Sequence, residues 1–542
     1  IAIGSVEQSQ YEEDVREVQE SHVGGTIDYS GQLTETVSVD ALGGVDYRYS
    51  SLSRNQGVTQ GGLSTQGVFT LENSVSRPSL DDFFQEQALV GVYGDVTVGY
   101  KNLAFVGGTL RNDWSSTLPA DNNRYLYPSI NGSFVFTNLA ALSESDVLSY
   151  GKLRMNWSRV GRDTDPYRLS FTYPIQSSFR GTIGQALPGA LPNFNLEPEI
   201  KSEWEIGTQL QFFNNRLGLD ATYYSAEIEN QIIQVEGSRA SGYQSRVLNA
   251  GTIANKGVEL SMNVTALETE SVSWDWTVNW SKNVEEVVSL AEGVSRVPLN
   301  NTAAAPPFGP SLTASEGGEF GVFFGPGFAR TDEGDKIVSG SGFYQSTGAQ
   351  ELGSYLPDWQ GGVSTTFAYE GFTASVLVDG QKGGNIWSLS NLFGLYSGMF
   401  AGSATNNIRQ LGARPDAVLE DGSPYYGVGG TADNPTTAAG NASAKNIFQT
   451  LFGTHEAHLY DASYIKLREV TLSYSLPQQW FSGTRVQNMT ASVYGRNLAT
   501  LLKYTPNFDP TAVVRGSGNL QGIEAGQMPP RRTIGFRLRF NF

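Results

Sequence analysis

The end of the chain constrains the fold most, because residues 533–542 alternate strictly between apolar and polar side chains. Side chains of a β-strand point to alternate faces, so this segment predicts a strand with one wholly apolar face and one polar face. The apolar face carries Ile534, Phe536, Leu538, Phe540 and Phe542. The polar face carries Gly535, Arg537, Arg539 and Asn541. A soluble β-sandwich also shows this alternation, so the rest of the chain must decide which medium the apolar face meets.

The composition favours an all-β fold. The 542 residues include 62 glycines, 28 phenylalanines, 25 tyrosines and 9 tryptophans, and only 17% are charged, which is rich in turn and strand formers. No run of about 18 apolar residues occurs, which excludes a transmembrane helix, whereas a transmembrane strand needs only about ten alternating residues. Cysteine is absent, so disulfides and thiolate metal sites are excluded. The net charge of −18 argues against nucleic-acid binding.

Strand candidates are joined alternately by short turns and by long loops. Two-residue hairpin signals occur at Asn214-Asn215, Lys101-Asn102 and Glu370-Gly371. The long stretches between the hairpins, rich in Gly, Pro, Asn and Ser, are residues 161–202, 227–254, 284–360, 381–462 and 499–532. Such loops are uncommon in compact soluble domains but are typical of outer-membrane barrels, where short turns face the periplasm. We therefore predict an all-β transmembrane antiparallel β-barrel with long extracellular loops, the alternative being a large secreted β-protein.

The strand count is about 16. About 13 candidates lie from Leu89 onward. Three more precede it, at residues 27–29, 37–49 and 67–72.

A family resemblance rests on motifs that follow one another in order from about Leu89. They are V-Y-G-D-V-T-V-G-Y-K-N (92–102), R-N-D-W-S-S (111–116), Y-L-Y-P-S-I (125–130), N-L-E-P-E-I-K-S-E-W-E-I-G (195–207), N-A-G-T-I-A-N-K-G-V-E-L (249–260), L-P-D-W-Q-G-G (356–362), D-G-Q-K-G-G-N (379–385), Y-D-A-S-Y-I-K-L-R-E-V-T-L-S-Y (460–474) and Y-G-R-N-L (494–498). Each motif is weak alone, but their order and spacing are specific. With them the chain resembles the C-terminal barrel portion of a SusC/RagA-type TonB-dependent outer-membrane transporter.

The resemblance implies a barrel of 22 antiparallel strands, of which roughly 16 would lie in this chain. Residues 1–542 are expected to form part of this single barrel domain, because the N-terminal plug domain, its TonB-contact segment and the early strands have no counterpart in the sequence. In the family, the aromatic terminal strand resembles the signal read by the barrel-assembly machinery. The residues that would carry this signal are Phe536, Leu538, Phe540 and Phe542.

The resemblance also implies active import of a nutrient, either an oligosaccharide or a peptide. The expected partners are a SusD-like surface lipoprotein that acts as a lid, the TonB complex acting through the plug, the lipid bilayer and lipopolysaccharide, with a dimer of transporter–lid pairs. The expected location is the outer membrane of a Gram-negative, Bacteroidota-like bacterium. A structural or assembly-associated barrel without active transport stays open as the alternative.

The sequence offers no catalytic constellation. There are three histidines, no G-x-S-x-G elbow and no nucleotide-binding loop, so we predict that the chain is not an enzyme. His455 and His458 are three residues apart, but they precede a strand, where a shared metal is not expected. Residues 331–335, T-D-E-G-D, partly match a calcium loop without its ligand spacing. We therefore expect no cofactor, with a structural Ca²⁺ as the open alternative.

Aromatic residues in the long loops are candidate contacts to the substrate or to the lid. They are Trp387, Tyr396, Tyr425 and Tyr426. Such rings stack on sugar faces or hold peptide side chains. The equally open alternative is that they pack the loops themselves.

Overall fold

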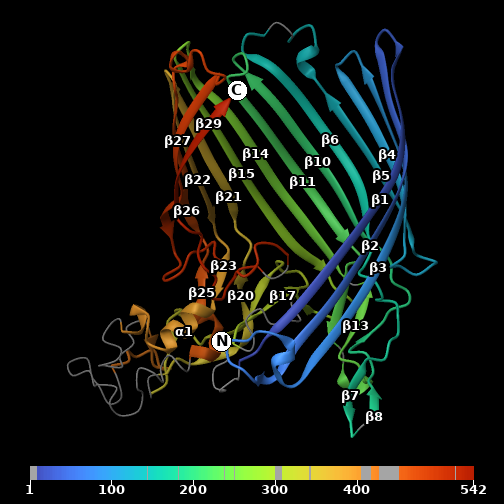
Figure 1. Cartoon of the computed structure of the whole chain (residues 1–542), viewed down its shortest axis with the longest axis vertical. Helices are drawn as coiled ribbons and strands as arrows, with labels where there is room; N and C mark the ends of the chain where they lie inside the picture. The colour runs from blue at the N-terminus through green and yellow to red at the C-terminus, as the bar shows by residue number, and fades with distance from the viewer. Residues whose placement is uncertain are drawn as a thin grey trace. The chain divides into compact units, whose positions relative to one another are not determined.

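The structure, a computed structural model, describes residues 9–142, 145–180, 182–236, 238–249, 251–299, 308–340, 343–404, 417–426, 451–518 and 521–541. The described residues form mainly antiparallel strands, and the largest sheet has fifteen, in the order β1-β2-β3-β4-β5-β6-β10-β11-β14-β15-β21-β22-β26-β27-β29 (Figure 1). No helix among the described residues is long and apolar enough to cross a membrane.

The chain divides into two compact units. Unit 1 comprises Ile1–Phe134, Arg154–Trp204 and Glu227–Thr252, and unit 2 comprises Val135–Leu153, Glu205–Ala226 and Ile253–Phe542. Four strands of the large sheet contribute residues to both units: β6 (Leu148–Arg162), β10 (Glu199–Phe212), β11 (Leu217–Glu229) and β14 (Thr252–Glu268), the last with only Thr252 in unit 1.

Five long strands form the main sheet of unit 1, each antiparallel to the next. They are β1 (Glu12–Thr34), β2 (Val37–Leu63), β3 (Ser74–Tyr100), β4 (Ala104–Ser115) and β5 (Arg124–Phe134). A turn lies between β3 and β4 where it was predicted, with positive φ at Lys101 and Asn102, 51° and 53°, but it spans residues 101–103 instead of two residues. The connections at the opposite strand ends, residues 64–73 and 116–123, are longer.

The two faces of this sheet differ as the sequence pattern predicts. On β3 the side chains of Val90, Val92, Val96 and Val98 are each 41–48% exposed. Leu110 of β4 and Ile130 of β5 are also exposed. The alternate positions carry polar residues such as Asp95 and Arg111. A water-soluble sheet buries its apolar face, whereas a transmembrane strand turns it toward lipid.

Unit 2 continues the large sheet with antiparallel pairs from β15 to β29. Its strands are β14 (Thr252–Glu268), β15 (Val272–Ser289), β21 (Trp359–Tyr369), β22 (Phe372–Lys382), β26 (Tyr464–Ser475), β27 (Asn488–Lys503) and β29 (Thr533–Asn541). The predicted two-residue turn at Glu370-Gly371 is confirmed, with φ of 43° and 91°. Within this unit the short turns lie at the strand ends near the C-terminus, and β23, β25 and α1 lie at the opposite ends (Figure 1).

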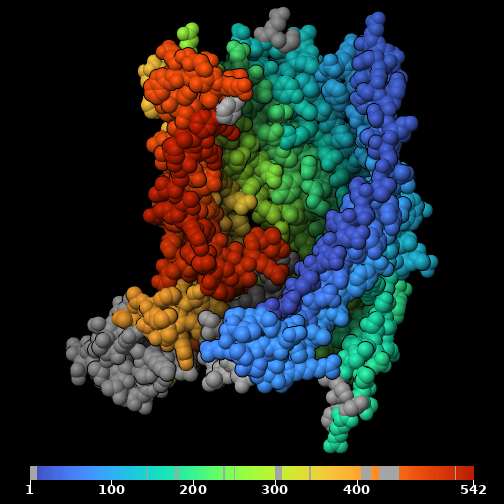
Figure 2. Space-filling view, viewed as in Figure 1, coloured from blue at the N-terminus to red at the C-terminus, as the bar shows by residue number. Residues whose placement is uncertain are grey.

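The terminal strand β29 has the predicted exposed apolar face. Ile534, Phe536, Leu538 and Phe540 are 42–73% exposed, and the atoms of this strand lie at the surface in Figure 2. Phe542 lies outside the described residues. On the other face, Gly535 pairs with Tyr494 of β27, whose ring covers it so closely that a Cβ would lie 2.4 Å from the ring. An aromatic ring over a cross-strand glycine is a known way of pinning register.

The long loops are not structureless, because they carry small sheets and a helix. In unit 2 these elements are β16 (Arg296–Pro298), β17 (Ser311–Ser315), β18 (Val322–Phe328), β19 (Lys336–Ile337), β20 (Ser346–Ser354), β23 (Asn385–Ser388), α1 (Leu389–Tyr396), β24 (Ala417–Val418), β25 (Leu459–Asp461) and β28 (Ile523–Glu524), with 3-10 turns η4 (Ala401–Ser403), η7 (Leu451–Gly453) and η8 (His455–His458). Two further 3-10 turns, η2 (Phe136–Asn138) and η9 (Gln478–Phe481), lie outside the long loops, in the connections from β5 to β6 and from β26 to β27. In unit 1 they are β7 (Ile175–Phe179), β8 (Thr182–Gln185), β9 (Ala190–Leu191), β12 (Ile232–Glu236) and β13 (Ser245–Asn249), with η1 (Leu71–Asn73) and η3 (Arg239–Ser241).

The loops of unit 2 share a hydrophobic core, which we call the loop core. It consists of Leu312, Phe323, Tyr355, Trp387, Leu392 and Ile523. These residues come from β17, β18, β23, α1, β28 and the segment after β20. The loops therefore fold as a packed layer of their own, which the sequence analysis did not foresee.

Two further local predictions are wrong. Residues 67–72 are not a strand but a turn that leads into η1. The side chain of Asn73 closes this turn by donating to the carbonyls of Thr65 and Val68, at 2.7 and 2.6 Å. The large sheet therefore has fifteen strands instead of sixteen, thirteen of them from β3 onward. The turn between β10 and β11 spans residues 213–216 instead of two residues.

The two-faced sheet makes a direct prediction for neighbouring residues of β3. In the complete protein, Val96→Arg places a guanidinium on the lipid face, which costs about 2–4 kcal/mol near the bilayer midplane. We expect less heat-modifiable, folded protein in the outer membrane. Thr97→Arg, on the polar face, is the matched control and leaves the folded yield close to that of the wild type. Equal yields for the two variants would contradict the assignment of faces.

Candidate functional site

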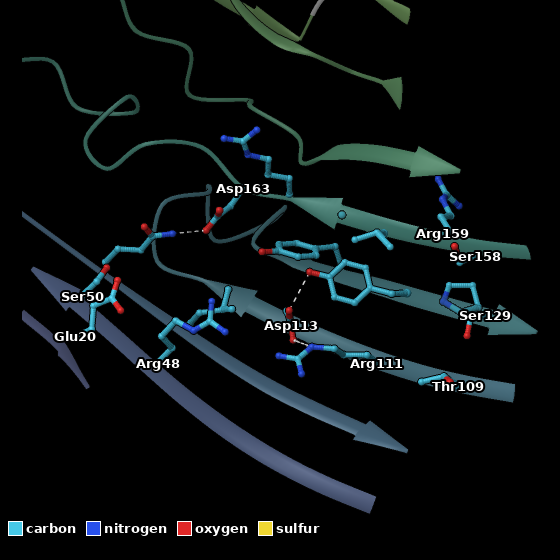
Figure 3. Close-up of a pocket in the computed structure, with 18 residues that line it drawn as sticks. Glu20, Arg48, Ser50, Thr109, Arg111, Asp113, Ser129, Ser158, Arg159 and Asp163 are labelled. Carbon is cyan, nitrogen blue, oxygen red and sulfur yellow. Dashed lines mark hydrogen bonds and ion pairs between the residues drawn. The ribbon is translucent and has the colours of Figure 1, made fainter. Parts of the chain in front are cut away.

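A pocket of about 680 Å³ lies on the polar face of unit 1 (Figure 3). The residues that line it come from β1 to β6 and from the residue that follows β6. It lies away from the short turn between β3 and β4, toward the ends of β4, β5 and β6 that lead into the longer connections. In an outer-membrane barrel these ends face the outside of the cell.

A row of directly paired residues runs along the floor of the pocket and beyond it: Asp113 and Tyr125 line the pocket, whereas Asp46 and Gly91 do not. Asp46 of β2 pairs with Gly91 of β3, Gly91 pairs with Asp113 of β4, and Asp113 pairs with Tyr125 of β5. Arg111 reaches across this row, donating from Nε to Asp113 Oδ1 at 2.7 Å and from Nη2 to Asp46 Oδ1 at 2.9 Å. Both carboxylates are buried. Buried carboxylates need such charge pairing, so Arg111 holds together three strands of the pocket floor.

Gly91 makes this bridge possible. A Cβ at this position would lie 2.2 Å from Arg111 Nη2 and 2.3 Å from Asp46 Oδ1. Real Cβ atoms do not approach other heavy atoms this closely. Any side chain at residue 91 would therefore have to displace the guanidinium from between its two carboxylates.

Two tyrosines form an aromatic wall beside the bridge. The rings of Tyr125 and Tyr127 lie 5.1 Å apart at 60°, and Tyr127 donates its hydroxyl to Asp113 Oδ2 at 2.9 Å. Gly161 leaves room for them, since a Cβ there would lie 2.8 Å from both rings. Tyr125 also belongs to a hydrophobic cluster with Leu196 and Val247. The wall is thereby anchored to the loops of unit 1.

The end of β6 is tied to the pocket by Asp163. Its Oδ2 accepts hydrogen bonds from Gln87 Nε2 at 2.6 Å, from the Ser115 hydroxyl and from the Thr117 hydroxyl at 3.2 Å. Ser115 and Thr117 are both buried. This carboxylate is therefore part of the framework of the pocket.

Three further arginines line the pocket, namely Arg48, Arg159 and Arg162. Within the part of the chain that the structure describes, none of the three forms an ion pair or a side-chain hydrogen bond. Figure 3 shows Arg48 and Arg159 at opposite ends of the pocket with Asp113 between them. The pocket thus combines a rigid, internally bonded floor with guanidinium groups that are open to a ligand.

This site was not predicted from the sequence. Arg111 and Asp113 of the bridge lie in the family motif R-N-D-W-S-S, and the two tyrosines of the wall lie in Y-L-Y-P-S-I, whereas Asp46 lies in no family motif. Pattern alone does not show which strands are neighbours, so the meeting of Asp46 with Arg111 could not be inferred.

The aromatic residues that the sequence singled out lie elsewhere, in the loops of unit 2. Trp387 has no exposed surface and belongs to the loop core. Tyr425 is buried beside Val338 in a separate cluster. Tyr396 packs edge-on against Phe452, with ring centroids 5.1 Å apart. These three aromatic residues pack within the loops, as the alternative in the sequence analysis allowed. The structure does not bring the four predicted aromatic residues together into one site. Contact of these residues, or of half-buried Tyr426, with substrate or lid stays a prediction, as does the assembly signal on β29.

The two histidines of η8 lie in a tightly packed part of unit 2. His458 is 1% exposed, and burial lowers its pKa to about 4. Burial also lowers the pKa of His455. Between them, Glu456 accepts hydrogen bonds from the amide of Phe328 and from Arg330, both at 2.7 Å. The histidines therefore help to pack η8 against β18.

The two places where the sequence was considered for metal binding are the histidine pair and residues 331–335. Across the described ranges, no group of three or more His, Cys, Asp or Glu residues could hold an ion. Residues 331–335 form a tight turn, in which the amide of Thr331 donates to the carbonyl of Asp335 at 2.9 Å. A structural Ca²⁺ at this turn stays an untested alternative.

Several family motifs meet in unit 2 on β22, β26 and β27. Arg468 forms a two-point ion pair with Asp379, at 2.6 and 2.8 Å. Arg468 also lies within 3.5 Å of Asn497 Oδ1 and contacts the Tyr464 hydroxyl at 3.4 Å. A second ion pair joins Lys466 to Asp509. The motifs that contain these residues therefore maintain strand register and loop attachment.

A sheet with one lipid-facing side and one polar side that carries a pocket defines the wall of an outer-membrane β-barrel. Residues 4–498 match the family described as "TonB dependent receptor-like, beta-barrel". The chain belongs to this family, whose members reside in the outer membrane of Gram-negative bacteria and are transporters and receptors rather than enzymes. The predicted fold class and the SusC/RagA-type family are confirmed.

Relatives and solved structures agree with this assignment. The chain is 25% identical over 548 residues to TonB-dependent receptor P26 of Formosa agariphila, covering 95% of this chain and 52% of that protein. It is 26% identical over 215 residues to TonB-dependent receptor SusC of Bacteroides thetaiotaomicron, covering 38% and 21%. The fold matches the structure of the RagAB peptide transporter with a TM-score of 0.77 at 20% identity, over 98% of this chain and 56% of that chain. The chain thus spans about half the length of the first of these curated relatives.

The bridge predicts that residue 91 tolerates no side chain. In the complete protein, Gly91→Ala separates Arg111 from Asp46 and Asp113, which leaves buried charge poorly paired and lowers the free energy of unfolding by about 1–3 kcal/mol. Gly94→Ala on the same strand is the control, because its nearest contact would be an ordinary 3.6 Å. Thermal unfolding in detergent measures both. A Gly91→Ala midpoint equal to that of Gly94→Ala would show that the bridge is unimportant.

His458 predicts a pH-dependent loosening of the loops of unit 2. Its pKa is 6.5 in an unfolded chain and about 4 when buried, so acidification protonates the open state first. Local stability is therefore lost as the pH falls from about 6.5 toward 4, by about 2 kcal/mol at pH 5. We expect faster amide exchange in residues 451–461 at pH 5 than at pH 7, after correction for intrinsic rates.

The control for this measurement is His458→Phe, which cannot be protonated. Its exchange in the same segment should depend on pH much less. If the wild type showed no acceleration at pH 5, or the variant showed the same one, His458 would not be the cause.

Proposed function

We propose that this chain is the barrel portion of an outer-membrane active transporter that imports a nutrient, an oligosaccharide or a peptide. The observation that carries the proposal is the pocket of unit 1, which lies on the polar side of a lipid-facing sheet, toward the strand ends that face outward in such barrels. The polar side of a barrel wall borders its interior. A cargo entering from outside would therefore meet the open arginines and the tyrosine wall.

We also propose a SusD-like lipoprotein lid and energy coupling through TonB for the whole protein. Family membership and the relatives named TonB-dependent receptors support the coupling, and the likeness to SusC supports the lid. The solved relative is described as a peptide importer, which keeps peptides among the candidate cargoes. A dimer of transporter–lid pairs, contact with lipopolysaccharide and a Bacteroidota-like source belong to the same proposal.

The test uses the native bacterium with the complete gene deleted and then restored. We expect deletion to abolish uptake of fluorescently labelled members of at least one library, of oligosaccharides or of peptides. Restoration should recover the uptake, and a protonophore should block it, because TonB coupling consumes the proton gradient. A lipoprotein should co-purify in mild detergent.

Two results would contradict the proposal. Unchanged uptake of both libraries after deletion would remove the import function. Uptake that the protonophore does not affect would remove the energy coupling and favour a passive or structural barrel.

A further inference from the structure

The charge of the pocket differs from that of the chain. The whole chain carries a net charge of −18. The residues that line the pocket nevertheless include four arginines, at positions 48, 111, 159 and 162, against three acidic residues, at positions 20, 113 and 163. Arginine is concentrated here in spite of the composition, and its function needs an explanation.

The carboxylates on the floor and beside β6 are already occupied. Asp113 accepts from Arg111 on one oxygen and from Tyr127 on the other. Asp163 accepts three hydrogen bonds on a single oxygen. These groups are therefore bonded within the framework. They leave Arg48, Arg159 and Arg162 as the charged donors that are not committed to a partner among the described residues.

The two ends of the pocket are not equivalent. Figure 3 shows Glu20 and Ser50 at the end where Arg48 lies, so a negative charge accompanies that arginine. The other end carries Arg159 with Ser158 and Ser129; the carboxylate near this end, Asp95, does not line the pocket and accepts a hydrogen bond from Thr109 at 2.8 Å. An anion would therefore be held most strongly toward Arg159.

We propose that the pocket binds a carboxylate group of the imported cargo, held mainly by Arg159, with Arg162 and Arg48 as the weaker contacts. A guanidinium presents parallel N–H donors that match the two oxygens of a carboxylate. The half-buried ring of Tyr127 offers an apolar surface next to this charge, on which a sugar face or an aliphatic stem can lie. The inference rests on the proposed import function and narrows its cargo to acidic oligomers.

The carboxylate could belong to an acidic oligosaccharide or to an acidic peptide, and matched probes separate these sources. The carbohydrate pair is trigalacturonate and its methyl ester. The peptide pair is triglutamate and triglutamine, both acetylated and amidated. Within each pair, only the charged carboxylates distinguish the acidic probe from the neutral one.

The experiment measures calorimetric binding of each probe to the complete protein, purified in mild detergent with its co-purifying partners. We expect at least one acidic probe to bind about tenfold or more tightly than its neutral counterpart, since hydrogen bonds to charged groups contribute on this scale. The preference should weaken in 0.5 M NaCl, because salt screens exposed charges. The tighter acidic probe identifies the source.

The variants locate the effect. The double variant Arg159→Gln/Arg162→Gln should reduce acidic-probe affinity about tenfold or more, and Arg48→Gln should reduce it less. Arg77→Gln is the control, an exposed arginine of β3 outside the pocket. It should bind as the wild type does. Heat modifiability verifies that each variant is folded. The variant Arg159→Lys keeps the charge without the two-point geometry, so its affinity for the acidic probe should lie between those of the wild type and the double variant.

Two results would overturn the inference. One is equal affinity for acidic and neutral probes, and the other is wild-type affinity in a folded double variant. The uptake assay separates this failure from failure of the import function. If deletion abolishes uptake but neither acidic probe is preferred, the import function is supported and the carboxylate site is contradicted. If acidic probes bind through Arg159 and Arg162 while deletion leaves uptake unchanged, the carboxylate site is supported and the import function is contradicted.

Discussion

The structure depends on one constraint, namely that a sheet in lipid must pair its backbone polar groups internally, so that only side chains select the medium on each face. In unit 1 the antiparallel register from β2 through β5 aligns Asp46, Gly91, Asp113 and Tyr125 in one row. Because side chains alternate with period two, a slip of one residue would turn such a row toward lipid. The same pairing that satisfies the backbone therefore also builds the polar pocket.

The pocket shows how a membrane-embedded sheet can keep charge on its inner side. Arg111 serves two carboxylates at once, and the absence of a side chain at Gly91 gives it the space to do so. Asp163 fixes the end of β6 through three donors. With the floor charges paired internally, the remaining arginines are available to a ligand. The pocket is suited to bind a ligand because some of its charged groups pair with one another while other arginines have no partner among the described residues.

Much of the strand layer could be predicted from the sequence, because period-two alternation and turn residues are local signals. The terminal strand and the turn at Glu370-Gly371 are examples. The residues of the site could not be predicted in the same way. Arg111 and Asp46 are 65 positions apart, and their contact follows from the order and register of β2, β3 and β4. Trp387 was a candidate contact to substrate or lid, with packing of the loops as the open alternative; it is buried, because loops distant in sequence form a core around it.

The most direct test of this account is the solvent exposure of alternate residues along β3. Residues 1–542 contain no cysteine, so single cysteines can be introduced into this region of the complete protein, after replacement of any cysteine that lies outside it, and labelled with nitroxides in lipid vesicles. Labels at residues 90, 92, 96 and 98 should be accessible to oxygen but not to a water-soluble nickel reagent. Labels at residues 93, 95 and 97 should show the reverse. Equal accessibility at both sets of positions would contradict a sheet with one face in lipid and one in the polar interior.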